Sequence, residues 1–68
     1  MKEEIFNAKI TRMEGHGIYK NISLVVDGTN SERTMIINWR FCGKVVIGKR
    51  YQISAKKNMV LDLYPIQE

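Results

Sequence analysis

Apolar and polar residues alternate along most of this chain, and a period of two is typical of strands with one buried face. In the clearest segment, 17–27, Lys20 is the only interruption of the apolar side. Turn signals rich in Gly, Asn, Asp and Lys separate five segments of this kind. We therefore predict strands at 4–13, 17–27, 33–41, 49–56 and 58–66.

The same alternation predicts which side chains point inward. The predicted inward residues, strand by strand, are Phe6, Ala8 and Ile10; Ile18, Ile22, Leu24 and Val26; Met35, Ile37, Trp39 and Phe41; Tyr51, Ile53 and Ala55; and Met59, Leu61 and Leu63. Phe41 is expected to pack beneath the connector that follows it. Four apolar side chains fall on the opposite, outward faces: Val25, Ile36, Val60 and Tyr64.

The pattern has little room for a helix. Residues 39–46 suit at most one turn, because Val45, Val46 and Ile47 are β-branched and Gly43 and Gly48 bracket them. Five short strands joined by turns favour a small all-β barrel, which removes exposed sheet edges. The 68 residues are enough for one domain, 1–68. The barrel is either of the oligonucleotide-binding (OB) type or SH3-like.

The distribution of charge along the chain is more informative about a partner than the net charge is. The formal net charge is +4, but residues 33–57 carry seven cations and no Asp or Glu. The rest of the chain therefore carries +4 minus +7, or −3. Such a concentration of positive charge points to a polyanionic partner. A solvated basic surface is the alternative.

The order of the segments resembles the OB-fold of single-stranded nucleic-acid-binding proteins. Two long strands meet at Gly15-His16-Gly17, a third ends in Asn38-Trp39-Arg40, and Gly48-Lys49-Arg50-Tyr51 opens a fourth that leads into Met59-Val60-Leu61. The family's usual helix between strands three and four is shortened or absent here. The short form is similar to small accessory proteins of phage and mobile-element replication modules. The resemblance implies binding across strands two and three, where Tyr19, Asn21, Ser23, Asn38 and Arg40 match that surface.

Binding a single strand requires cations for its phosphates and flat side chains for its bases. The residues predicted to bind nucleic acid are Lys9, Tyr19, Asn21, Asn38, Trp39, Arg40, Arg50, Gln52, Lys56 and Lys57. Alternation places Trp39 in the core, whereas a bulge near the strand end would turn it outward as a stacking platform. Tyr51 is expected in the core, and His16 is read as a tolerant loop residue.

Several functional classes have no support in the sequence. Cys42 and His16 are the only soft metal ligands, and no paired acid and base or phosphate-binding glycine motif occurs, so we expect no enzyme, metal or cofactor. No apolar run is long enough to span a bilayer. A cytoplasmic protein is the simplest expectation, in keeping with a lone thiol.

Two hypotheses follow. The first is non-enzymatic binding of single-stranded DNA or RNA, in replication or nucleic-acid metabolism. The alternative is a protein-interaction module: a small subunit of a polymerase or primase complex, or a phage-encoded inhibitor of a host enzyme. The outward apolar residues favour the alternative. The sequence leaves open the choice of DNA or RNA, the protein partner, and whether the chain forms a homo-oligomer.

Overall fold

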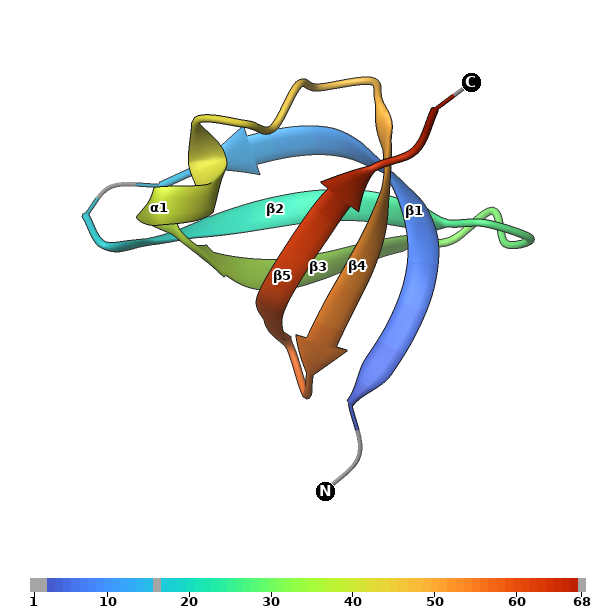
Figure 1. Ribbon diagram of the computed structural model, residues 1–68, viewed down its shortest axis with the longest axis horizontal. Helices are drawn as coiled ribbons and strands as arrows, with labels where there is room; N and C mark the ends of the chain where they lie inside the picture. The colour runs from blue at the N-terminus through green and yellow to red at the C-terminus, as the bar shows by residue number, and fades with distance from the viewer. Residues whose placement is uncertain (1–2, 16, 68) are drawn as a thin grey trace.

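The computed structural model describes residues 3–15 and 17–67 and folds them into five strands and one short helix (Figure 1). The elements in chain order are β1 (Glu4–Glu14), β2 (Tyr19–Val26), β3 (Glu32–Asn38), α1 (Trp39–Cys42), β4 (Arg50–Lys56) and β5 (Met59–Pro65). All five predicted strands are present, and the largest difference is that the third ends at Asn38 instead of Phe41. His16, predicted to be a loop residue, lies outside the described residues.

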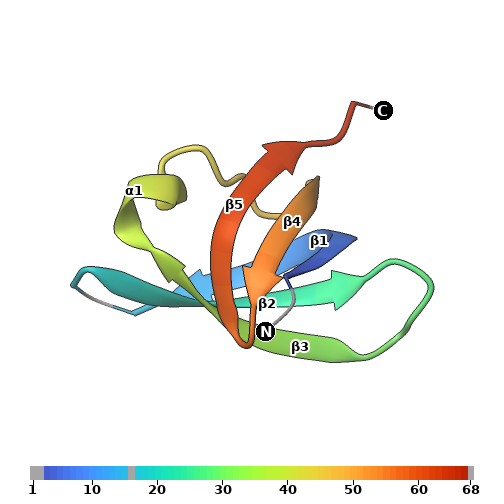
Figure 2. The same cartoon turned by 60° about the horizontal axis from the view of Figure 1, so that its bottom comes forward.

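The strands form a closed barrel in the order β1-β2-β3-β5-β4. β1 pairs antiparallel with both β2 and β4, while β3 pairs with β2 and β5 pairs with β4. One parallel residue pair between β3 and β5 completes the ring. Figure 2 shows the β4–β5 hairpin rising over the layer formed by β2 and β3. The predicted fold class, a small five-stranded all-β barrel with the helix between strands three and four shortened, is confirmed.

The barrel interior is filled with apolar side chains, as expected for a ring of this size. The buried apolar residues are Ala8, Ile10, Ile22, Leu24, Met35, Ile37, Tyr51, Ile53, Ala55, Val60 and Leu63. All of them except Val60 belong to the face that the alternation predicts. Phe6, Val26 and Phe41 are partly buried and pack against this core. Tyr51 is in the core, as predicted.

β5 departs from strict alternation. Its pairing with β4 shifts between Ser54 and Ala55, so that Ala55 faces Val60 while Ser54 faces Asp62. Leu61 is the extra residue of this bulge, and an extra residue interrupts the alternation, so that residues before it and after it no longer follow one continuous inward–outward pattern. Val60 is therefore 2% exposed, whereas Met59 and Leu61 are each 39% exposed. The predictions that Val60 points outward and that Met59 and Leu61 lie in the core are wrong.

β2 differs from the prediction at two positions. Ile18 precedes the first residue of the strand and is exposed, because the ladder with β3 begins only at Tyr19. Ser23, expected on the outer face, is buried, and its carbonyl accepts a hydrogen bond of 3.2 Å from the Thr11 hydroxyl. Thr11 lies at a second irregularity, between Ile10 and Arg12 of β1, which brings the two strands to a new register. The tyrosine predicted to be exposed at the start of β2, Tyr19, is exposed.

The connector from α1 to β4 is held by the core tyrosine. The Tyr51 hydroxyl donates to the Lys44 carbonyl at 3.1 Å and accepts from the Val46 amide at 2.8 Å. Val45 is partly buried against the core, whereas Val46 and Ile47 are exposed. Of these three β-branched residues, only Val45 packs against the core.

Candidate nucleic-acid interface

A groove lies where β3 and β5 meet and then diverge. The two strands share one residue pair, Ile36 with Met59, and the Ile36 amide donates to the Asn58 carbonyl at 2.7 Å. Beyond this point β3 runs on into α1, whereas β5 continues along β4. Two hollows open on the outer surface along this line, and both are lined by Met59 and Leu61. We call the pair of hollows the β3–β5 groove.

The hollow next to α1 has a volume of about 250 Å³. Its lining residues are Tyr19, Asn38, Arg40, Phe41, Met59, Val60 and Leu61. Tyr19 and Asn38 are cross-strand neighbours, so the tyrosine ring stands beside the residue that ends β3. Arg40 lies 5.7 Å from the centre of the Phe41 ring, measured from its guanidinium carbon. This end of the groove therefore combines an exposed aromatic ring with a cation.

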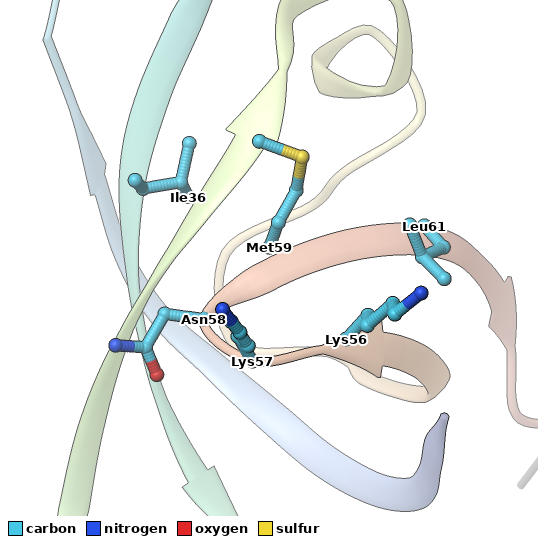
Figure 3. Close-up of a pocket in the computed structure, with 6 residues that line it drawn as sticks. All are labelled: Ile36, Lys56, Lys57, Asn58, Met59 and Leu61. Atoms are coloured by element: carbon cyan, nitrogen blue, oxygen red, sulfur yellow. The ribbon is translucent and has the colours of Figure 1, made fainter. Parts of the chain in front are cut away.

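The hollow at the β4–β5 hairpin is larger, about 420 Å³, and is lined by Ile36, Lys56, Lys57, Asn58, Met59 and Leu61 (Figure 3). Its floor is aliphatic, and Ile36 and Met59 face each other across the line between β3 and β5. Two hydrogen bonds from β3 hold the hairpin tip: one is the Ile36 bond to Asn58, and the other runs from Arg33 Nη2 to the Lys57 carbonyl at 3.3 Å. The tip is thus fixed against β3.

Not all cations of the basic run are available to a ligand. Arg33 pairs with Glu4, Lys44 with Asp62 at 3.8 Å, and Arg50 with Asp27. The described residues show no ion pair for Arg40, Lys49, Lys56 or Lys57, and three of these four line the groove. No Asp or Glu is among the described residues that line it. The groove is therefore positive at both ends.

The predicted site residues fall on two walls of the barrel. The groove brings together Tyr19, Asn38, Arg40, Lys56 and Lys57. Asn21 lies beside it, opposite Ile36 in the β2–β3 ladder. Lys9, Arg50 and Gln52 lie instead on β1 and β4, where Lys9 faces Arg50. Since β1 and β4 lie opposite β3 in the ring, these three residues do not share the face of the groove.

Trp39 is not a core residue, contrary to the alternation. It is the first residue of α1 and is 60% exposed. The Asn38 side chain caps the helix, accepting from the Arg40 amide at 3.0 Å, and an Asn in this position ends a strand and starts a helical turn. The Trp39 amide donates to the Ile18 carbonyl at 2.6 Å, beyond the last pair of the ladder. The alternation therefore stops one residue before Trp39.

Tyr64, Asp62 and Lys44 form a polar cluster on the surface around β5 and the connector. The Tyr64 hydroxyl donates to Asp62 Oδ2 at 2.6 Å, and the Lys44 ammonium lies 5.5 Å and 5.8 Å from the ring centres of Phe41 and Tyr64. The hydrogen bond from Tyr64, then the amide of Leu63 and the charge of Lys44, lower the pKa of Asp62. The same carboxylate raises the pKa of Tyr64, so the phenol stays neutral and Asp62 stays charged. Lys44 is thereby tied to β5 and not to the groove.

Sequence reasoning missed the aliphatic part of the groove. Met59 and Leu61 were assigned to the core, because an alternating pattern carries no mark of the bulge that turns them outward. Ile36 was recognised as an outward apolar residue but not as part of a binding surface. The signal that was present is the Lys56-Lys57-Asn58 turn, which places two cations on a hairpin tip.

Comparison of the chain with protein-family models, characterised proteins and solved structures gave no match. Within residues 3–15 and 17–67, no group of three or more His, Cys, Asp or Glu side chains is arranged to hold a metal ion. In the same part of the chain, no helix has the length and apolarity needed to cross a bilayer. The candidate function therefore rests on the groove itself.

Proposed function

We propose that this chain binds single-stranded nucleic acid, DNA or RNA, without catalysis, along the β3–β5 groove. The observation that carries the proposal is the lining of the groove: Arg40 stands at one end, Lys56 and Lys57 stand at the other, and none of the described residues that line it is acidic. A phosphate backbone is attracted to such a surface along its whole length. A basic surface that served only solubility would not need its cations at the two ends of the β3–β5 groove.

The middle of the groove suits unpaired bases. Tyr19, 51% exposed, presents an aromatic ring at the α1 end, and stacking on such rings is worth roughly 1–3 kcal/mol per base. Asn38 uses its side-chain oxygen to cap α1, which leaves its amide N–H groups to donate to base edges. A base pair would hide these edges and faces, so the groove favours a single strand over a duplex.

The resemblance to OB-fold proteins agrees with this placement. The groove runs beside β2 and β3 and ends at the β4–β5 hairpin, and in an OB-type barrel these strands and that loop border the binding surface. A role in replication, in a phage or mobile element, follows from the resemblance alone and is proposed on that ground.

A salt-series titration tests the proposal. Binding of oligo(dT) is measured by gel shift and by Tyr and Trp fluorescence. The logarithm of the binding constant is expected to fall linearly with the logarithm of the salt concentration. Three groove cations predict a slope of about −2 for a single strand. A duplex of equal length is expected to bind more weakly. No complex at tens of micromolar protein in low salt would refute the proposal.

Two lysine variants locate the site. Lys56→Ala removes an exposed strand cation at the groove, and Lys9→Ala removes an exposed strand cation on the β1–β4 wall. We expect Lys56→Ala to reduce the magnitude of the salt slope by about 0.7 and Lys9→Ala to leave it unchanged. Equal losses from the two variants would move the site away from the groove.

A protein partner is the second candidate, favoured by apolar residues exposed outside the groove. These residues are Ile5, Ile18, Trp39, Val46, Ile47 and Tyr64. Trp39 and Ile18 are joined by a backbone hydrogen bond and form a neighbouring pair at one end of the barrel. Co-purification with a purified polymerase or primase, together with a blue shift of Trp39 emission, would support it. Light scattering of the chain alone tests self-association as the simplest form of this candidate.

A further inference from the structure

The hairpin hollow differs in chemistry from the rest of the groove. Its floor consists of Ile36, Met59 and Leu61, which are 37–39% exposed and whose side chains carry no hydrogen-bond donor. Its rim consists of Lys56, Lys57 and Asn58, and the Asn58 side chain points away from Met59 (Figure 3). A volume of about 420 Å³ lies in the range of sites that hold small organic groups. The hollow thus offers an apolar wall beside two cations and no aromatic platform.

Lys57 occupies a backbone conformation that lysine disfavours. Its φ is 56°, in the left-handed region, where Gly or Asn is usual and other residues carry a cost on the order of 1 kcal/mol. Its side chain is exposed, and in the described part of the chain it forms no ion pair that would compensate. A strained residue that contributes nothing to the core is a reason to look for a function. Here the residue places a positive charge at the rim of the hollow.

We infer that the hairpin hollow holds one unstacked nucleobase of the bound strand, with the adjoining phosphates on Lys56 and Lys57. This inference rests on the proposed function and adds a recognition element to it. The two faces of a base are apolar, and Met59, with its flexible and polarisable thioether, adapts to a flat ring between Ile36 and Leu61. Because the floor contacts the face of the base and not its hydrogen-bonding edge, the hollow accepts any base of suitable size.

The charge of the rim favours a nucleotide over a peptide side chain. An aromatic residue of a protein would also fit an aliphatic hollow, but it would bring no negative charge to the two lysines. A nucleotide brings a phosphate on each side of its base, close to where the hairpin places Lys56 and Lys57. The aromatic peptide is therefore an outcome that the experiment must separate from the nucleobase.

Methyl NMR of the full chain, labelled with ¹³C at the methionine methyl groups, tests the inference directly. A base lying on Met59 shifts its methyl resonance upfield by ring current, while the methyl group of Met35, fully buried in the core, serves as an internal control. We expect oligo(dT) to shift the Met59 signal and leave Met35 unchanged. An oligonucleotide of abasic residues, which keeps the phosphates, is expected to leave both signals in place. Met59→Leu assigns the resonance.

Binding constants provide a second readout with a matched control. Met59→Ala is expected to weaken oligo(dT) binding by about 4-fold or more, the equivalent of at least one buried CH2 group. Ile47→Ala, which shortens an apolar residue that is 50% exposed and lies outside the groove, is expected to leave affinity unchanged. An unchanged Met35 methyl signal in each variant verifies that the barrel is intact.

The outcomes separate the two proposals. No oligonucleotide binding at all defeats the proposed function. If oligo(dT) binds but the Met59 methyl resonance does not shift, or if abasic and normal strands shift it equally, the proposed function stands. The inference that the hollow holds a base is then overturned. A Met59 shift caused by an acidic aromatic peptide and by no oligonucleotide would assign the hollow to a protein partner and also overturn it.

Discussion

Arg33 forms a two-pronged ion pair with Glu4, in which its Nη1 and Nη2 atoms lie 3.1 Å and 3.2 Å from the two carboxylate oxygens. The pair joins β1 to β3, two strands that do not pair with each other and that flank β2 in the ring. The same guanidinium donates to the Lys57 carbonyl and lies 5.4 Å from the centre of the Phe6 ring. Arg33 therefore belongs to the framework that holds the hairpin tip, although its charge made it part of the basic run.

Acid is expected to weaken this framework. The hydrogen bonds and charge of Arg33 lower the pKa of Glu4, so the stabilisation is complete above the ordinary pKa of a glutamate and is lost as pH falls through the lowered value. We expect the thermal midpoint of the wild-type chain to fall as pH drops below about 4, and to fall less steeply in Glu4→Gln. Glu3→Gln, which removes the same charge next to β1, is the control. Parallel curves for Glu4→Gln and wild type would contradict this role of Arg33.

Removing the Tyr51 hydroxyl is expected to loosen the connector. Tyr51→Phe leaves the Val46 amide and the Lys44 carbonyl without their partner in a part-buried setting, where such a loss costs about 1–3 kcal/mol. Urea denaturation measures the change in the free energy of unfolding. Tyr19→Phe removes a hydroxyl from an exposed tyrosine and is expected to cost less than about 0.5 kcal/mol. Equal effects of the two substitutions would argue against a structural role for Tyr51.

The sequence predicted the barrel because every strand of a closed ring follows one simple rule: successive side chains point alternately inward and outward. The rule failed where a local hydrogen bond or an extra residue interrupted it. The Asn38 cap ends β3 before Trp39, and the bulge at Leu61 exchanges the roles of Val60 and Leu61. Both interruptions depend on backbone geometry that residue types mark only weakly.

The candidate site was only partly predictable, for a different reason. A run of cations in sequence does not reveal which of them meet acidic side chains in space. Arg33 and Arg50 pair with Glu4 and Asp27, which come from distant segments. Lys56 and Lys57 keep their charge available because the hairpin turn projects them, and that turn was visible in the sequence.

The bulge in β5 makes a prediction of its own. Leu63→Ala removes a fully buried side chain and is expected to cost about 2–5 kcal/mol, whereas Leu61→Ala is expected to cost less than about 1 kcal/mol. Strict alternation assigns both leucines to the core and predicts similar losses. Denaturant unfolding of the two variants distinguishes these possibilities, and comparable losses would place Leu61 inside the barrel.

The backbone of Lys57 predicts an inversion of the usual ranking of alanine and glycine. Glycine normally destabilises a strand by about 0.5–1 kcal/mol relative to alanine, and we expect this order at Lys56, within β4. At Lys57, where φ is 56°, alanine retains the clash of its Cβ atom and glycine does not, so Lys57→Gly is expected to be the more stable variant by about 1 kcal/mol.

The two Lys57 variants are nevertheless expected to lose the same affinity for oligo(dT), because each removes one positive charge from the rim of the groove. The two variants would then differ in stability but not in affinity. If Lys57→Gly were less stable than Lys57→Ala, the backbone there would carry no strain. The lysine would then be an ordinary turn residue, and its conformation would no longer support a role in ligand binding.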